Sequence, residues 1–478
     1  VARGQLCLTN PEVLRLGVAA VLEWIRQHPA ASLYSVSQND WEGWCECDNC
    51  RRVEQEEGGR HSGPILRFVN ALAAEIAKKH PDKLLDTLAY WYSEDPPLKA
   101  RPRPNVRIRL CPIGVCEAHP YESCPYSAYF LKNLRAWSQI TNQLYIWHYN
   151  TNFSHYLLPF PDFDELAADI PLYRRHGVVG LFMEGAYPKG GGGEMSELRS
   201  WVMARQLWDT ATNVSQAVDE FLAAVYGPAA RPLRAYFDLL HRQVRDGRRH
   251  LWINPVPDYP DDFLRQAVAL FRQAEDAAAG DRAVLRRVQQ ARLSIDYLDL
   301  LRAKTYTVRD GLYGPADPAG LQDRFRTFLE RVRSFGITSL HEGRDLSFDE
   351  QEFAGHRAPR RVLTLENDSW RLDLAPELSG RVLRMINKRA GRDLLRRVDS
   401  GERGYPDLGG LGVFAYPDYY ARPWEIRWDP DGRTGALPNG LRLRRRIILD
   451  GVTVRTETVV DNPTAAALEV VLQSRLEL

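Results

Sequence analysis

The residues from 34 to 50, which read YSVSQNDWEGWCECDNC, combine side chains that suit carbohydrate chemistry. Asp40 follows the apolar run 33–36, so its carboxylate stands where a short predicted strand ends. Trp41 and Trp44 come directly after it, and flat indole rings stack on the faces of sugars. A carboxylic acid can protonate the oxygen of a glycosidic bond, so the stretch predicts a carbohydrate site. A turn capped by Asp40, with tryptophans that only pack, is the alternative interpretation.

Three of the seven cysteines follow this strand end at C-x-C-x2-C spacing, and they are Cys45, Cys47 and Cys50. They offer three soft metal ligands, whereas a structural zinc ion needs four. The candidates for the fourth ligand are Cys7, Cys116 and His119. Disulfides and buried free thiols are equally open interpretations, because spacing alone does not settle connectivity. We predict no metal site and no cofactor, with a possible structural thiol cluster at these three cysteines that fixes the tryptophan loop.

Composition limits the class of protein. The chain has 478 residues, 44% hydrophobic residues and a net charge of +1, which allows two to four domains with sizeable cores. A balanced charge argues against an extended nucleic-acid surface, and no apolar run reaches the length of a membrane helix. The chain starts at Val1 rather than at Met, so we expect that residues preceding it were removed or are encoded upstream.

The first 190 residues alternate strand and helix signals. Strands are predicted at 33–36, 83–92, 106–111, 144–149 and 178–183, with helices at about 11–28, 63–79, 126–140 and 163–175. Such alternation predicts parallel strands with right-handed crossovers, as in a TIM barrel. A doubly wound sheet is the competitor, but no glycine-rich phosphate loop follows an early strand. A barrel needs eight strands, so we interpret these five as its C-terminal part, with the first three upstream of Val1.

Polar and aromatic side chains follow the predicted strands, where a barrel keeps its active site. We predict Asp40 and Glu184 as the catalytic carboxylates, with Asp40 as an acid/base whose pKa is raised by Trp41 and Trp44. An ion pair with Arg199 or Arg205 is the alternative for Glu184. The predicted substrate-binding residues are Asn39, Trp41, Trp44, Tyr92, Glu94, His119, Trp147, His148, Tyr149, Asn150 and Tyr187. A purely structural role is the alternative for both histidines.

The pattern of apolar and polar residues divides the remaining chain into two regions. Helical spacing without strands predicts a helical domain at 206–345, after a barrel domain at 1–205, and the last of its helices are expected at 282–308 and 321–335. From 360 to 478, apolar and polar residues alternate between turn signals, which is typical of an antiparallel β-sandwich. Residues 376–381, followed by RVLRMINKRAGRDLL, resemble the opening of a galactose-mutarotase-like sandwich.

Several motifs occur together and in order, among them SVSQNDWEGWCECDNC, CPIGVCEAHP, LYIWHYNTNFSHYLLPFPD and GVVGLFMEGAY. As a set, over about residues 5–245, they resemble a bacterial family labelled a domain of unknown function, whose glycoside-hydrolase-like barrels are distantly similar to those of α-glucuronidases and β-hexosaminidases. In this family an Asp is usual where this chain has His148. The resemblance implies a barrel with glycoside-hydrolase-type activity and leaves the sugar open.

We therefore expect a glycoside hydrolase-like enzyme whose partner is a carbohydrate, and neither nucleic acid nor membrane. The alternative is a non-catalytic carbohydrate-binding barrel, and a metal-dependent hydrolase ranks last, because thiolate-rich zinc sites are usually structural. A bacterial protein of this kind is expected to be secreted or periplasmic. The sequence leaves its oligomeric state open.

Overall fold

The structure, a computed structural model, describes residues 4–187, 192–247, 249–303, 307–315, 317–355, 359–376, 381–395, 411–416, 426–429, 432–436, 442–463, 465 and 471–476. The chain separates into two compact units. The first comprises Val1–Ile295 and Gly336–Gly343, and the second comprises Asp296–Phe335 and Arg344–Leu478. A short segment of the first unit thus returns to it after an excursion of the chain through the second.

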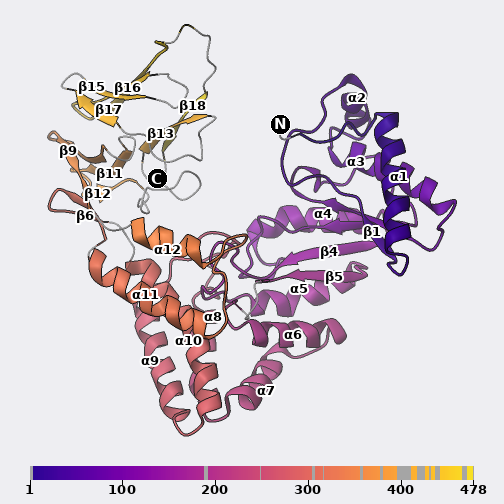
Figure 1. The fold of residues 1–478 in the computed structure, drawn as a ribbon, viewed down its shortest axis with the longest axis horizontal. Coiled ribbons are helices and arrows are strands. Elements are labelled where there is room, and N and C mark those ends of the chain that lie inside the picture. Colours follow the sequence, from indigo (N-terminus) through magenta and orange to yellow (C-terminus); the bar gives the residue numbers. More distant parts are fainter. Residues whose placement is uncertain are drawn as a thin grey trace. The chain divides into compact units, whose positions relative to one another are not determined.

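A curled, five-stranded parallel sheet forms the centre of the first unit (Figure 1). Its strands follow one another in space as in the sequence: β1 (Leu33–Ser35), β2 (Leu84–Ala89), β3 (Val106–Leu110), β4 (Leu144–Tyr149) and β5 (Gly180–Glu184). All four pairings are parallel. The predicted parallel β/α order is therefore confirmed, because each strand runs in the same direction and its C-terminal end meets the same edge.

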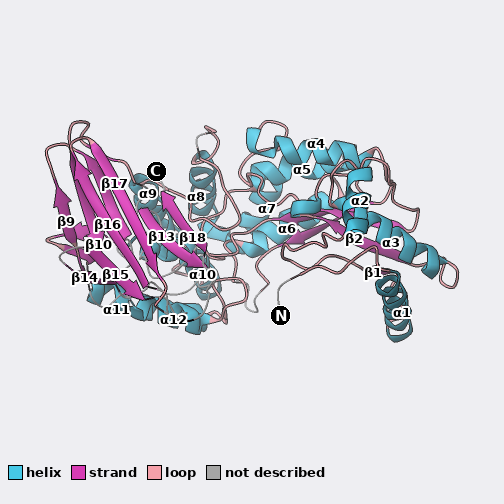
Figure 2. Ribbon diagram, turned by 90° about the horizontal axis from the view of Figure 1, so that it is seen from above, coloured by secondary structure: helices cyan, strands magenta, loops and turns pink. Residues whose placement is uncertain are grey.

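Helices cover one face of this sheet (Figure 2). They are α1 (Pro11–Gln27), α3 (Ser62–Ala77), α4 (Ala128–Ser138) and α5 (Phe163–Arg175). The start of α1 is set locally, because the Asn10 side chain accepts a 2.8 Å hydrogen bond from the Glu12 N–H and Pro11 occupies the first turn. Between helices and sheet lies a dry core to which Leu72 and Leu134 contribute, both fully buried.

The two faces of β4 show how the strand period separates core from site. Leu144 and Ile146 belong to the core under the helices, whereas Tyr145 and Trp147 are only partly buried. Side chains alternate between the two faces of a strand, so Tyr145 and Trp147 must stand on the face away from the helices. The helix-facing side therefore binds the unit together and leaves the other face for chemistry.

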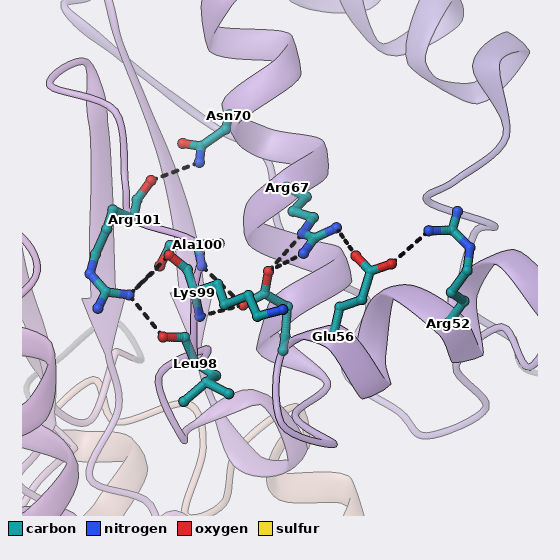
Figure 3. Close-up of polar contacts among 9 residues, drawn as sticks. Arg52, Glu56, Arg67, Asn70, Leu98, Lys99, Ala100 and Arg101 are labelled. Carbon is teal, nitrogen blue, oxygen red and sulfur yellow. Dashed lines mark hydrogen bonds and ion pairs between the residues drawn. The ribbon is translucent and has the colours of Figure 1, made fainter.

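The helix α2 (Asp48–Glu56) was not anticipated, because most of its residues are polar or charged. It is fastened to α3 by Arg67, whose guanidinium donates to Glu56 and to Glu57 at 2.7 Å each (Figure 3). Buried Glu57 also accepts 2.7 and 2.9 Å hydrogen bonds from the backbone of Lys99 and Ala100. Burial would raise the pKa of Glu57, but these hydrogen bonds outweigh it and the pKa is lowered.

Helices complete the first unit: α6 (Ser196–Trp208), α7 (Val214–Tyr226), α8 (Ala230–Arg242), α9 (Asp261–Ala277) and most of α10 (Arg282–Ala303). One-turn 3-10 helices lie at Trp91–Ser93, Pro125–Ser127 and Gly227–Ala229. The helix expected at 282–308 is shorter than predicted, because Thr307–Arg309 is already a strand. None of the described helices has both the length and the apolar character that a bilayer crossing requires.

The second unit is made of antiparallel sheets with two helices, α11 (Pro318–Ser334) and α12 (Leu346–Gly355). A six-stranded sheet contains β9 (Leu363–Glu366), β10 (Trp370–Ala375), β11 (Arg381–Asn387), β12 (Arg392–Asp393), β13 (Leu411–Tyr416) and β18 (Val471–Leu476). A four-stranded sheet contains β14 (Ile426–Asp429), β15 (Gly432–Ala436), β16 (Arg442–Asp450) and β17 (Thr453–Asp461). A three-stranded sheet contains β6 (Thr307–Arg309), β7 (Leu312–Gly314) and β8 (Arg360–Arg361).

The six- and four-stranded sheets touch through an apolar cluster in which Leu372 of β10 and Val382 of β11 are fully buried, with Ile447 of β16 packed against them. The Trp370 indole also donates a 2.8 Å hydrogen bond to the Val452 carbonyl at the β16–β17 turn. The antiparallel architecture predicted for the C-terminal part is confirmed. The motif predicted to open a mutarotase-like sandwich lies partly outside the described residues, since 377–380 are among those not described.

Candidate functional site

A cavity of about 420 Å³ lies at the C-terminal ends of the strands of the parallel sheet. All five strands or the residues just after them contribute to it, through Gln38 and Asp40, Leu88 and Tyr90, Cys111 and Ile113, Trp147 and Tyr149, and Glu184. Phe153, Ile253, Asn254 and Glu342 complete the wall. This is the edge of a parallel sheet where open α/β folds and barrels alike bind their ligands.

Three carboxylates face this cavity: Asp40, Glu184 and Glu342. The charge of Asp40 adds to burial in raising the pKa of the Tyr90 hydroxyl, which lines the same cavity. Glu184, the last residue of β5, accepts a 2.5 Å hydrogen bond from the Trp147 indole N–H of the neighbouring strand. The structure thus brings the two acids that the sequence singles out, from the first and the last strand of the sheet, to one cavity.

The environment disfavours the charged forms of two of these acids. Burial raises the pKa of Glu184, and the charge of Glu342 raises it further, although the hydrogen bond from Trp147 works in the opposite direction. Burial raises the pKa of Glu342 as well, with the charge of Asp40 adding to the effect. Carboxylic acids with raised pKa values are the groups that enzymes use as proton donors near neutral pH.

Aromatic rings make the cavity suitable for a sugar. Trp147 is held upright on β4, because Phe182 of β5 meets it edge-to-face with ring centroids 4.6 Å apart. The Arg109 guanidinium lies 5.6 Å from the Trp147 ring and is ion-paired with Asp86. Tyr149 lies against Phe153 in the same edge-to-face manner, at 6.0 Å. These fixed rings offer flat surfaces on which a sugar ring can stack.

Asn39, Trp44 and Tyr92 lie elsewhere, in the wall of a second cavity of about 160 Å³. There Trp44 stacks on His61, with ring centroids 3.9 Å apart, and on Tyr92 at 5.2 Å. Trp41 contacts the N-terminal segment instead, where its indole donates a 3.2 Å hydrogen bond to the Gly4 carbonyl. The expected shielding of Asp40 by Trp41 and Trp44 is therefore wrong, because neither ring lines its cavity.

Glu94, His148 and Asn150 are buried and do not line the larger cavity. Glu94 accepts a 3.1 Å hydrogen bond from Asn133 of α4, and burial raises its pKa to about 7. His148 has the same strand parity as Leu144 and Ile146, so it points to the helix side, where Nε2 lies 3.4 Å from Glu165 of α5. The predicted substrate contact of His148 thus finds no support in its position.

Asn150 and Tyr187 make hydrogen bonds that connect loops around the cavity. The backbone N–H of Asn150 donates a 3.0 Å hydrogen bond to the backbone carbonyl of Glu184, which ties the ends of β4 and β5 together. Tyr187 is 64% exposed, and its hydroxyl accepts a 2.8 Å hydrogen bond from the Gly343 N–H. Arg199 and Arg205 pair with other acids, so the alternative of an ion pair for Glu184 is wrong.

Sequence reasoning missed Glu342 and Asn254, because both come from segments far along the chain. The Glu342 N–H donates to the Phe153 carbonyl at 2.8 Å, and the Phe153 N–H donates to the Ile253 carbonyl at 2.6 Å. These pairings draw both segments to the loop after β4. No local sequence pattern predicts such a contact. Tyr90, in contrast, could have been predicted to line the cavity, because it follows Leu88 at the strand period of two.

Three groups of side chains place potential metal-ligand atoms within 4.8 Å of one another. The first is Cys7, Cys45, Cys47 and Cys50; the second is Cys116, His119, Cys124 and His250; the third is Glu117, His148 and Glu165. Among the predicted sources of a fourth ligand for the first group, Cys7 is therefore the one that the fold supplies. His119 belongs to the second group and not to the cavity. No disulfide joins any of the seven cysteines, all of which are described.

The third group is fully buried between β4 and α5. Burial raises the pKa of Glu165 to about 8 and lowers that of His148 to about 4, so both are held neutral at pH 7. The His148 Nδ1 lies 3.0 Å from the Tyr173 hydroxyl. A neutral network of this kind suits a core polar cluster.

Residues 2–238 match the family model described as "Domain of unknown function (DUF4838)", which is just under half of the chain. The family resemblance predicted for about 5–245 is confirmed to that extent. No curated protein matches the chain. Among solved structures, 4-alpha-glucanotransferase from Thermococcus litoralis is matched at 12% identity over 86% of this chain and 80% of that chain, with a TM-score of 0.17. A TM-score this low reflects no shared overall fold, so nothing about this chain follows from it.

Proposed function

We propose that the first unit is a glycoside hydrolase-like enzyme that cleaves a glycosidic bond in the cavity at the C-terminal edge of its parallel sheet. The observation that carries the proposal is the convergence of Asp40 and Glu184, from the first and last strands, on one cavity walled by Trp147 and Tyr149. Glycoside hydrolysis needs two carboxyl groups, one of them protonated, and an apolar surface for the sugar. The cavity supplies two carboxyl groups and aromatic walls, and the raised pKa of Glu184 favours its protonated form.

The different environments of Asp40 and Glu184 suggest different catalytic roles. Glu184 has a raised pKa and keeps one oxygen fixed by Trp147, so its carboxyl group would donate a proton to the leaving oxygen as the bond to the anomeric carbon breaks. Asp40, which lines the same cavity, would stabilise the positive charge that develops on the sugar ring. Water then supplies the hydroxyl group that replaces the leaving alcohol, and its remaining proton returns to Glu184.

The curled sheet supports the finer proposal that the first unit is the C-terminal part of a (β/α)8 barrel, as the sequence predicts. Five consecutive parallel strands with cavity-lining side chains at or just after their C-terminal ends fit that architecture. We also infer a carbohydrate as the partner of the cavity, with a secreted or periplasmic location in keeping with that substrate.

Substitution of each acid tests the proposal on a panel of glycosides with good and poor leaving groups. If Glu184 is the acid, Glu184→Gln should lose on the order of a hundredfold in kcat/KM on natural glycans and far less on activated aryl-glycosides, which need little protonation. Asp40→Asn should lose a similar factor on both kinds of substrate. Glu42→Gln is the matched control, because it removes an exposed acid two residues from Asp40.

Full activity of both variants on a natural glycan would overturn the assignment. Sugar binding in the wild-type protein without turnover of any glycoside would instead identify a carbohydrate-binding protein, the alternative that the sequence leaves open. Calorimetric titration with the same glycans separates these two outcomes.

A further inference from the structure

The first thiol group gathers four cysteines from two segments of the chain, the N-terminal segment and the stretch 45–50. Cys7 precedes α1, Cys45 and Cys47 belong to the loop after β1, and Cys50 lies in the first turn of α2. The Cys7 sulfur lies 3.7 Å from that of Cys47 and 3.8 Å from that of Cys50. Four thiolates around one zinc ion, with Zn–S bonds of about 2.3 Å, have sulfur atoms roughly 3.8 Å apart. These two separations match those in a tetrahedral zinc site, and all four sulfurs lie within 4.8 Å of one another.

The surroundings of this group suit thiolates. The Thr9 hydroxyl lies 3.2 Å from the Cys50 sulfur and 3.8 Å from that of Cys47, so it can donate a hydrogen bond to a metal-bound sulfur. Arg67, Glu56 and Glu57 hold α2 against α3, so Cys50 is presented from a fixed helix (Figure 3).

The second group has a mixed set of ligands. The Cys116 sulfur lies 3.2 Å from Nδ1 of His119 and 3.3 Å from Nδ1 of His250, and the Cys124 sulfur lies 3.8 Å from the latter. A tetrahedral zinc ion bound to two thiolates and two imidazoles has sulfur–nitrogen separations of roughly 3.5 Å. The observed distances scatter around that value.

The second ring nitrogen of His119, Nε2, has a backbone partner. Its Nε2 lies 2.7 Å from the Val244 carbonyl, so the N–H on Nε2 donates there and Nδ1 carries the lone pair that faces the cysteines. Histidines that bind metals commonly donate their other N–H to a backbone carbonyl in this way. The Ala118 N–H points at the Cys116 sulfur from 3.4 Å, which favours a thiolate.

We propose that the chain binds two structural zinc ions, one at Cys7, Cys45, Cys47 and Cys50, and one at Cys116, His119, Cys124 and His250. Thiolate and imidazole ligands select zinc over magnesium or calcium. Each site supplies four protein ligands, which closes the coordination sphere and fits a structural rather than a catalytic ion.

Both ions would hold segments that reach the larger cavity. The first ties the loop that carries Asp40 to the N-terminal segment and to α2. The second joins the loop after β3 to His250, and the adjacent Glu117 N–H donates to the Leu251 carbonyl at 3.0 Å. Ile253 and Asn254, which line the cavity, follow directly. The proposal stands on the ligand geometry alone and does not need the cavity to be catalytic.

Metal analysis of the full chain, purified without chelator, tests the proposal. We expect two zinc ions per chain by mass spectrometry, one in Cys47→Ser and one in His250→Asn. Cys111→Ser and His28→Asn are the matched controls and should keep two, because neither residue belongs to a cluster. Cobalt substitution adds a readout that needs no variant, since sulfur-to-cobalt absorption should report six thiolates in the wild-type chain.

Should a ligand variant fail to fold, stepwise release of zinc from the wild-type chain by a thiol-specific mercurial still counts the ions. Wild-type chain without zinc would overturn the proposal, whether its six cluster cysteines are free thiols or have formed up to three disulfides, which lower the mass by six hydrogens. So would two zinc ions retained in both ligand variants. Loss of zinc in only one of them would overturn the site whose variant keeps its metal.

Discussion

At the scale of single residues, three effects act on the pKa of Glu184, and they do not all have the same sign. Burial and the charge of Glu342 raise its pKa, while the indole of Trp147 lowers it. Because a proton donor works only while it is protonated, the proposed activity should fall as the pH rises through the pKa of Glu184. The alkaline limb of the pH profile therefore reports on this one group.

We predict that Glu342→Gln moves the alkaline limb of kcat/KM to lower pH. The substitution keeps the volume of the side chain but removes a negative charge that disfavours ionised Glu184, so the pKa of Glu184 falls. Measurement of kcat/KM between pH 4 and 9 on one aryl-glycoside, with Glu42→Gln as control, tests this. A shift to higher pH, or an unmoved limb, would contradict the role assigned to Glu184.

At the scale of elements, the pairing of β4 with β5 positions the proposed acid. Tyr145 of β4 lies across from Gly180 of β5, and its hydroxyl donates a 2.9 Å hydrogen bond to the Leu181 carbonyl. A Cβ atom on Gly180 would stand 2.3 Å from the Tyr145 ring. Gly180 thus leaves room for the Tyr145 ring. This room permits the β4–β5 register in which Glu184 lies beside Trp147.

We predict that Gly180→Ala lowers the free energy of unfolding by about 1 to 3 kcal/mol, because the Tyr145 ring must move or the two strands must separate. Gly280→Ala, at a position with no heavy atom within 4 Å, should stay within about 0.5 kcal/mol of wild type. Urea denaturation of the two variants measures the difference. Equal unfolding free energies would mean that the β4–β5 contact is looser than described.

At the scale of the whole molecule, the balanced net charge of +1 contrasts with the acidic cavity. Asp40, Glu184 and Glu342 line it, and none of its described lining residues is basic. A negatively charged sugar would lose its hydration there without gaining a cationic partner. Under the proposed function, the cavity should therefore prefer neutral sugars.

We predict at least tenfold higher kcat/KM for a neutral aryl-glycoside than for the uronide that differs only at C6. Repulsion of about 1 to 2 kcal/mol from nearby carboxylates accounts for this factor. Glu342→Gln should narrow the difference, because it removes one of the charges. Preference for the uronide would show that a basic group reaches the site.

The sequence by itself determined the order and direction of the five strands, because apolar alternation and the helices between strands are local properties that survive in any packing. It also placed Asp40 and Glu184 at one edge of the sheet, since Glu184 ends β5 and Asp40 lies in the loop after β1. The side of the sheet taken by His148 followed from strand parity as well, although the chemical type of the residue suggested a site.

Only the tertiary structure decided what surrounds these acids. The chain leaves β2 through Trp91, whose φ of 53° is left-handed, and this turn sends Tyr92 to the smaller cavity with Trp44. Glu342 and His250 join residues more than a hundred positions away. Such contacts depend on which distant surfaces bury each other and on which backbone groups remain to be paired, and a local pattern carries no information about either.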